Sequence, residues 1–262
     1  MRGGVLRSTF LHLPGVGPIT EAELWQHGIV DWSTFREERS VPGVSAERKA
    51  RWNREIDLSE DALERNDPGY FARRLPAGEA WRLYPTFRSS VGFLDIETTG
   101  LSPYEGTVTV VTVHGDGRTR TFVADDDLEE LPAFLRRYPV FASFNGIAFD
   151  VPFLQARFPG LVEPLAHIDL APVLRRLGYA GGLKRIEQVL GLGDRSGVEG
   201  IHGIDAVRLW EAFRRGQPEA LDRLVRYNRA DTLNLEPLLD FAVGELTVRL
   251  LGNPRAAIPS SD

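Results

Sequence analysis

The sequence predicts an α/β fold in which helices flank a mixed sheet of five strands, preceded by a small N-terminal helical segment. Between residues 91 and 123, short runs of β-branched and apolar residues are separated by turn residues, which is typical of consecutive strands. Beyond residue 127, short apolar runs alternate with longer amphipathic segments, which indicates strands that alternate with helices. A chain of 262 residues is long enough for one large domain or two ordinary ones.

The helical segment is expected to comprise residues 1–88. These residues are polar, helical in pattern and rich in tryptophan. The stretch His12–Gly17, followed by residues 19–25, resembles a helix-hairpin-helix turn, in which backbone amides at a helix start can bind a phosphate. In that interpretation Thr20 caps the helix and Glu23 completes a capping box. The alternative is a packing turn that docks this segment on the sheet domain.

The sheet domain is expected to span residues 89–251, followed by a flexible tail at 252–262. Its first strand is the apolar run 91–96, which ends at the turn Thr98-Thr-Gly100. The next segment, 107–114, alternates Thr with Val and leads into a Gly-Asp-Gly hairpin turn. The complete set of expected elements is strands at 91–96, 107–114, 118–123, 140–144 and 167–170, and helices at 128–138, 149–158, 171–178, 183–191, 203–215 and 218–241.

Composition excludes several classes of protein. The absence of cysteine excludes a disulfide framework, a thiolate zinc site, an iron–sulfur cluster and a cysteine nucleophile. No apolar run approaches the roughly 18–20 residues of a membrane-spanning helix, so no membrane partner is expected. The N-terminal arginines are not followed by an apolar core, so we expect no signal peptide and a cytoplasmic location. The net charge of −6 argues against a passive nucleic-acid coat protein.

The first candidate site residues are Asp95 and Glu97, in the sequence LDIETTG. Residues two apart on a strand point to the same face. Two carboxylates on a buried face are costly unless a cation neutralises them, and no basic residue lies between Val91 and Arg118. A bound divalent metal is the simplest neutraliser. The alternative is that both acids lie in solvent at the end of the strand.

Two further clusters follow along the chain. Asp150 begins a helix after a strand and an Asn-Gly turn, where an acid is also favoured simply as a helix cap. Tyr227 and Asp231 are four residues apart on a predicted helix, so they share one face, as many surface pairs do.

The three clusters together indicate a metal site. Four carboxylates and one phenol offer only oxygen ligands, which suit Mg²⁺ or Mn²⁺. Two such ions about 3.5–4 Å apart can clamp the attacking and leaving oxygens of a phosphodiester. The four negative charges would balance the four positive charges of two divalent ions.

The segments that carry these residues, LDIETTGL, SFNGIAFDVPFL and YNRAD, resemble the three motifs of the DEDD (DnaQ-like) 3′→5′ exonucleases, which have a ribonuclease H-like fold. The tyrosine four residues before the last acid resembles the DEDDy branch. Within that superfamily the chain is similar to the bacterial YprB-like group, which resembles the proofreading domain of family B polymerases. The resemblance covers residues 91–241 and extends to 167–170, 183–191 and 203–210.

The resemblance implies roles for individual residues. It implies that two Mg²⁺ or Mn²⁺ ions are held by Asp95, Glu97, Asp150 and Asp231. Tyr227 would orient the attacking water, and a metal would lower the pKa of that water. The 3′-terminal nucleotide would lie against the turn formed by Thr98, Thr99, Gly100 and Leu101, with Leu101 packing on a base. Asn145 and Phe149 would line the path of the strand. For Phe149, packing in the core is the alternative to stacking on a base.

The sequence therefore predicts a metal-dependent 3′→5′ exonuclease that acts on single-stranded DNA or RNA ends and releases 5′-mononucleotides. The first alternative is a ribonuclease or structure-specific endonuclease with the same site. The second is a nucleic-acid-binding module without catalysis. His167 and Asp169 are further candidate ligands, but we expect Asp169 to be structural because four acids already complete the site.

Overall fold

The computed structural model describes residues 4–161, 164–201 and 203–252, so His202 and most of the predicted tail lie outside the described residues. The chain divides into two compact units. Unit 1 contains the residues up to Arg88 and those from Ala242 onward, and unit 2 contains Ser89–Phe241. We describe each unit by itself.

Unit 2 is built on a single mixed sheet of five strands. The strand order is β3-β2-β1-β4-β5. The pairs β1–β2 and β2–β3 are antiparallel, whereas β1–β4 and β4–β5 are parallel. The sheet confirms the predicted fold class. Its strands are β1 (Val91–Thr98), β2 (Val108–Gly115), β3 (Arg118–Val123), β4 (Val140–Ser143) and β5 (Ala166–Asp169).

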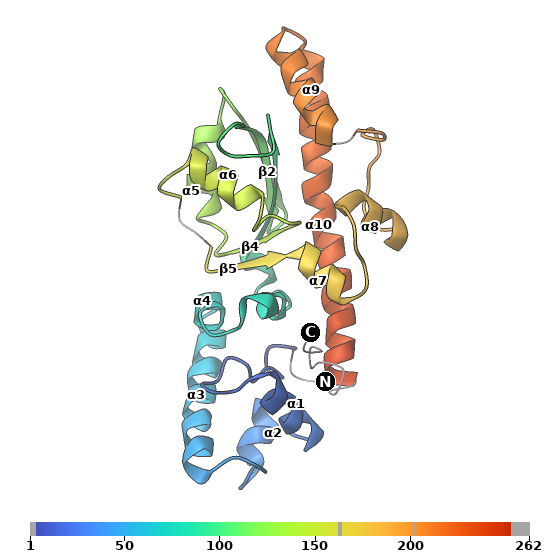
Figure 1. Ribbon diagram of the computed structural model, residues 1–262. Helices are drawn as coiled ribbons and strands as arrows, with labels where there is room; N and C mark the ends of the chain where they lie inside the picture. The colour runs from blue at the N-terminus through green and yellow to red at the C-terminus, as the bar shows by residue number, and fades with distance from the viewer. Residues whose placement is uncertain (1–3, 162–163, 202, 253–262) are drawn as a thin grey trace. The chain divides into compact units, whose positions relative to one another are not determined.

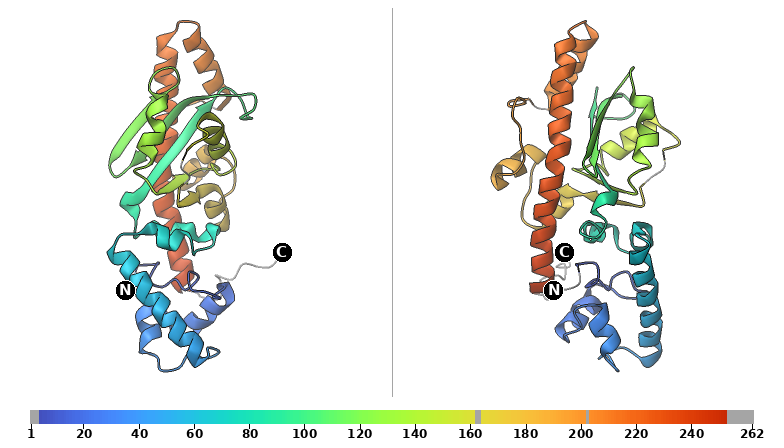
Figure 2. Two further views of the ribbon diagram at one scale, coloured as in Figure 1. Left: turned by 90° about the vertical axis from the view of Figure 1, so that its left-hand side faces the viewer. Right: turned by 180° about the vertical axis from the view of Figure 1, so that it is seen from behind.

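Helices cover both faces of this sheet (Figures 1 and 2), with α5 and α6 on one face and α9 and α10 on the other. Residues of β1 alternate between the two layers, as expected for a strand. Leu94 and Ile96 pack into the apolar cluster beneath α5 and α6. Asp95 and Glu97 therefore point toward the face covered by α10. The helices of this unit are α5 (Leu131–Leu135), α6 (Asp150–Arg157), α7 (Leu170–Arg176), α8 (Leu183–Leu190), α9 (Gly203–Arg214) and the part of α10 (Pro218–Gly252) up to Phe241, with a short 3₁₀ turn at Leu128–Glu130. Another 3₁₀ turn, Arg88–Ser90, precedes β1.

Two helices differ from the sequence prediction. The expected helix at 128–138 is a 3₁₀ turn followed by the short α5, because Pro132 lacks a backbone N–H and fits only the first turn of an α-helix. The helix expected to end at residue 241 continues to Gly252. Its extension is stabilised by further buried apolar residues at helical spacing, including Val243, Leu246 and Leu250.

Unit 1 is a helical unit with an aromatic core. Trp32 stacks on Phe71 with ring centroids 6.1 Å apart, and Trp52 packs against Phe35 at 6.0 Å. The four tryptophans of residues 1–88 are all buried. Its helices are α1 (Pro18–Gln26), α2 (Trp32–Glu37), α3 (Ala46–Glu64), α4 (Pro68–Ala72) and a 3₁₀ helix at Ala77–Leu83.

The start of α1 corrects one sequence prediction. The helix begins at Pro18 with Gly17 as N-cap and has no side-chain cap, so the prediction that Thr20 caps it is wrong. Proline suits the first helical position because its missing N–H would be unpaired there anyway. The helix therefore starts before Thr20, and Glu23 forms no capping box.

Glu21 on α1 forms a buried ion pair instead. Its carboxylate accepts hydrogen bonds from the backbone amides of Phe10 and Leu11, at 2.6 and 3.1 Å. It also accepts from Nη1 of Arg82 at 2.9 Å, and both side chains are almost fully buried. Burial raises the pKa of Glu21, whereas Arg82 lowers it. Glu21 thus joins the chain before α1 to Arg82 in the segment that follows α4.

The described helices, including the long α10, are all too short or too polar to span a lipid bilayer.

Removing one partner of the buried pair should destabilise unit 1. We expect Arg82→Met to lower the free energy of unfolding by about 3–5 kcal/mol, because Glu21 would stay buried without its counter-charge. Urea unfolding followed by tryptophan fluorescence measures this, since four of the five tryptophans lie in unit 1. In the control Arg36→Met, an ion pair with exposed Asp57 is lost, at an expected cost of ~0–1 kcal/mol. Equal effects of the two changes would contradict the prediction.

Candidate metal-binding site

Three predicted acids meet where β1 faces α10. Asp95 and Glu97 lie two residues apart on β1, and Asp231 lies on α10. One carboxylate oxygen from each of the three lies within 4.8 Å of the others. Glu97 and Asp231 are buried, and Asp95 is half-buried. The alternative in which the strand acids end in solvent is therefore wrong.

The fourth acid, Asp150, is the first residue of α6 and is 4% exposed. It lies outside the group of three but is near enough to raise the pKa of both Asp95 and Glu97. Its carboxylate is also hydrogen-bonded to the backbone of Ile96 on β1. Gly146 permits this close packing, because a Cβ there would lie 3.2 Å from a carboxylate oxygen of Asp150.

The four acids repel one another electrostatically. Burial raises the pKa of Asp95 and of Glu97 well above their ordinary values, and the charges of Asp231 and Asp150 raise them further. Burial also raises the pKa of Asp150, to about 7. A divalent cation would remove the repulsion and take the place of these protons. Hard oxygen ligands without sulfur or imidazole fit Mg²⁺ or Mn²⁺.

Tyr227 lies one helical turn before Asp231, as the spacing predicts. It is 5% exposed and packs in a cluster with Val110 and Leu224. Burial raises the pKa of its hydroxyl, as do the charges of Asp231 and Glu97 and a hydrogen bond to Asp231. The hydroxyl therefore keeps its proton at neutral pH and can donate it to a hydrogen bond.

Asn228 is a site residue that the sequence analysis missed. It is fully buried, and its amide Nδ2 donates to the carboxylate of Asp95 at 2.8 Å and to the backbone carbonyl of Asp95 at 3.1 Å. It also hydrogen-bonds Glu97. The available signal was its position three residues before Asp231, on the same helix face. Asn228 orients the strand acids from α10.

A bulge lies beside Glu97. The β1–β2 register pairs Glu97 with Val110 but Thr98 with Val108, which leaves Thr109 unpaired in the register. The hydroxyl of Thr109 donates to the carbonyl of Glu97 at 3.0 Å. Bulges redirect side chains next to functional sites.

Four of the predicted nucleic-acid contacts are Thr98, the last residue of β1, and the loop residues Thr99, Gly100 and Leu101 that follow it. The hydroxyl of Thr98 donates to the carbonyl of Gly100 at 2.6 Å, and the hydroxyl of Thr99 accepts from the amide of Thr107 at 2.9 Å. Leu101 projects from the loop and is 91% exposed. Leu101 is therefore an exposed apolar side chain four residues after Glu97 in the chain.

The other two predicted contacts lie between β4 and α6. Asn145 is exposed and adopts a left-handed backbone with φ of 61°. Phe149 is half-buried against the apolar cluster under α6, with its ring centroid 5.0 Å from that of Phe153. The position of Phe149 therefore fits the alternative in which its ring packs in the core.

Asp169 has a structural position, as expected. Its carboxylate accepts from the backbone amides of Asn145 at 2.7 Å, Ile147 at 3.3 Å and Ala171 at 3.1 Å. It thereby holds the loop before Asp150. Burial lowers the pKa of His167 to about 4, so that this ring is neutral and pairs with the hydroxyl of Ser143 at 2.7 Å.

Two cations adjoin the acids, and the sequence analysis assigned a role to neither. Arg195 donates from Nη1 to Asp231 at 2.5 Å. Lys184 on α8 lies with its Nζ 4.3 Å from the ring centroid of Tyr227 and donates to the carbonyl of Ile201. Both line a cavity of about 680 Å³ between α8 and the segment 191–201. No local sequence pattern marks these residues, because they reach the site from separate segments.

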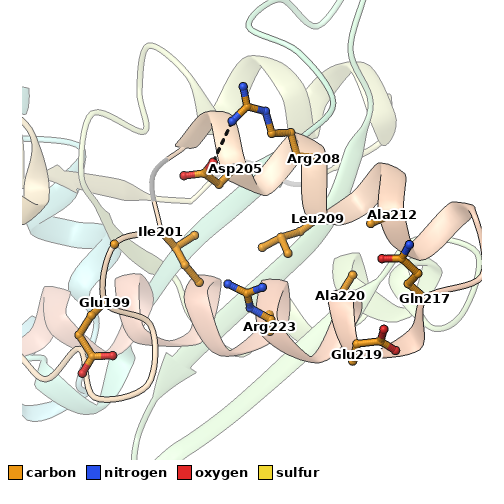
Figure 3. Close-up of a pocket in the computed structure, with 11 residues that line it drawn as sticks. Glu199, Ile201, Asp205, Arg208, Leu209, Ala212, Gln217, Glu219, Ala220 and Arg223 are labelled. Carbon is orange, nitrogen blue, oxygen red and sulfur yellow. Dashed lines mark hydrogen bonds and ion pairs between the residues drawn. The ribbon is translucent and has the colours of Figure 1, made fainter.

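A second cavity, of about 500 Å³, lies between α9 and the first turns of α10 (Figure 3). Leu209 and Ala220 line this cavity together with charged side chains. One of these, Arg208, donates a hydrogen bond from Nη1 to the carboxylate of Asp205 at 3.3 Å. The residues 199–201 line both cavities, so this short segment separates them.

The chain resembles known proteins in fold. Over 64% of its length it is similar to the family B DNA polymerase of the archaeon Pyrobaculum calidifontis, with 22% identity and a TM-score of 0.47, and the match covers 26% of that polymerase. Over 65% it is similar to Brucella melitensis NrnC with bound Mg²⁺, with 20% identity, a TM-score of 0.40 and 79% of that chain covered. No curated protein matches the sequence.

The model of the RNase H superfamily matches residues 92–243, the region that contains all of the sheet except Val91 and all four acids. This match covers more than half of the chain. The chain therefore belongs to the RNase H superfamily.

Proposed function

We propose that this protein is a metal-dependent 3′→5′ exonuclease that hydrolyses phosphodiester bonds at single-stranded nucleic-acid ends and releases 5′-mononucleotides. The proposal rests above all on the three carboxylates of Asp95, Glu97 and Asp231, whose oxygens lie within 4.8 Å of one another. Asp150 and Tyr227 complete the set that the DEDDy motifs require. Membership of the RNase H superfamily is consistent with this chemistry.

In this proposal Asp95, Glu97, Asp150 and Asp231 hold two Mg²⁺ or Mn²⁺ ions. When bound, such ions supply positive charge at the phosphate and lower the pKa of water. Asn228 fixes Asp95 by its 2.8 Å bond, so that the carboxylate is oriented before metal binding. Tyr227 keeps its phenolic proton and orients the attacking water through its hydroxyl.

The loop beside the acids would hold the terminal nucleotide. Exposed Leu101 would pack on a base, and the backbone of Thr98, Thr99 and Gly100 would contact the sugar. Asn145 would lie along the path of the strand. Because Phe149 packs against Phe153, we assign it to the wall of this path rather than to free stacking.

Labelled oligonucleotides test the function directly. DNA and RNA strands, each labelled at the 5′ or the 3′ end, are incubated with Mg²⁺, Mn²⁺ or EDTA. We expect 3′-labelled strands to release a labelled mononucleotide at once, 5′-labelled strands to shorten stepwise, and EDTA to stop both. Internal fragments would instead support an endonuclease. Strand binding without any product in either metal would support a binding module.

Loss of one acid should abolish hydrolysis without unfolding the protein. We expect Asp95→Asn or Asp231→Asn to lower the rate more than about a hundredfold, because a metal ligand is lost. Without metal, the melting temperature of the variant should equal or exceed that of the wild type, since a buried repulsion is relieved. Addition of Mn²⁺ should raise the melting temperature of the wild type but not that of the variant. Asp222→Asn, at an exposed position of α10, is the matched control. Near-normal turnover of either variant at saturating Mn²⁺ rules out the metal-ligand assignment.

Tyr227→Phe should separate catalysis from metal binding. Removal of the hydroxyl should lower kcat by roughly 10²–10⁴-fold, the contribution of a positioned hydrogen-bonding or proton-transfer group. The affinity for Mn²⁺, measured by calorimetric titration, should stay nearly the same because the acids are untouched. A variant with wild-type kcat would show that Tyr227 only packs in the core.

A further inference from the structure

The acidic cluster has a cationic neighbour that the proposed function does not use. Arg195 donates from Nη1 to Asp231 at 2.5 Å. From its other side it donates from Nε and Nη2 to both carboxylate oxygens of Glu187, with the Nη2 bond at 2.8 Å. The guanidinium therefore joins a proposed metal ligand to an acid outside the cluster.

The bond to Glu187 is the fixed end of this bridge. Glu187 is 3% exposed on α8 and accepts a third bond, from Nδ2 of Asn234, at 3.1 Å. Asn234 also accepts from the amide of Asp194 at 2.9 Å, so that α10 holds the segment next to Arg195. Gly193 packs tightly there, because a Cβ would come within 2.7 Å of Asn234. Arg195 is thus positioned from both α8 and α10.

The bond between Arg195 and Asp231 is the one that a bound metal ion can break. A divalent ion held by Asp95, Glu97 and Asp231 would share a carboxylate with the guanidinium, and the two positive charges would repel. The side chain of Arg195 is 18% exposed and lines the cavity of about 680 Å³. A phosphate that approached the metal site would come within reach of Nη1, the charged donor that Glu187 does not bind.

We infer that Arg195 is a phosphate-binding residue of this site. In the metal-free protein it neutralises Asp231. On metal binding, its Nη1 leaves Asp231 and donates to a phosphate oxygen of the bound strand, while Glu187 keeps the guanidinium in place. This inference rests on the proposed function, because the phosphate it assigns is that of the nucleic-acid substrate.

The first test measures metal binding without turnover. Arg195→Gln should bind Mn²⁺ about three- to tenfold more tightly than the wild type in a calorimetric titration, because a competing cation is removed from Asp231. Arg136→Gln is the control for net charge, since Arg136 is exposed at the end of α5 on the opposite face of the sheet. It should bind Mn²⁺ as the wild type does.

The second test measures strand binding. The probe is a short 5′-fluorescein DNA strand with phosphorothioate linkages at its 3′ end, which slow hydrolysis, and anisotropy is followed in Mn²⁺ at several salt concentrations. Arg195→Gln should bind it about tenfold more weakly. The slope of log affinity against log salt should also fall by about 0.7, the value for one lost phosphate contact on a single strand. Arg195→Lys should keep the wild-type slope but lose affinity, because it retains the charge without the guanidinium.

Three outcomes would overturn the inference. The first is that Arg195→Gln binds Mn²⁺ no more tightly than the wild type does. The second is that Arg195→Gln binds the strand more weakly but with an unchanged salt slope. The third is that the wild type does not bind Mn²⁺ at all. The first two would show that Arg195 only supports the structure around α8. Failure of the proposed function is separate: a wild-type protein that binds Mn²⁺ and the strand but never cleaves it would contradict hydrolysis and leave the Arg195 measurements intact.

Discussion

Repulsion among buried carboxylates at the end of β1 is the constraint on which the rest of unit 2 depends. Asp95, Glu97 and Asp231 offer oxygens within 4.8 Å of one another, and Asp150 lies near enough to add to their repulsion. Burial alone raises the pKa of such groups, and each neighbouring acid raises it further. A fold that holds these groups together must supply hydrogen bonds and positive charge to the same place, and the sheet and α10 are arranged to do so.

Residues from several elements supply these hydrogen bonds and this positive charge. Asn228 on α10 donates to Asp95, and Arg195 neutralises Asp231 from the segment after α8. Asp169 acts indirectly, because its carboxylate accepts hydrogen bonds from three backbone amides and not from the acids. Two of these amides, those of Asn145 and Ile147, belong to the loop that leads to Asp150, so Asp169 holds that loop in place. If the acids bind metal as proposed, these contacts would hold the site in place before a cation arrives and reduce the reorganisation needed on binding.

The same arrangement separates two tasks that a nuclease must perform. Carboxylates attract metal ions but repel the phosphates of the substrate, so a site made only of acids would hinder strand binding. Arg195 and Lys184 place positive charge on the side of the acids that opens into the cavity between α8 and residues 191–201. Glu187 and Asn234 hold Arg195 there by packing and hydrogen bonds. Positive charge is thus held in direct contact with the acidic cluster, through the ion pair of Arg195 with Asp231.

The sequence by itself determined the local features: the sheet strands, their alternation with helices, and the acids at Asp95, Glu97, Asp150 and Asp231. These follow from spacing, because residues two apart on a strand or four apart on a helix share a face wherever the element lies in the fold. It erred at α1 and α5, where prolines at 18 and 132 set the helix starts. Only the tertiary structure decided the roles of Asn228, Arg195 and the bulge at Thr109. Their contacts join residues far apart in the chain, such as Asn228 with Asp95 and Arg195 with Asp231, and no spacing within one element records a distance between two elements.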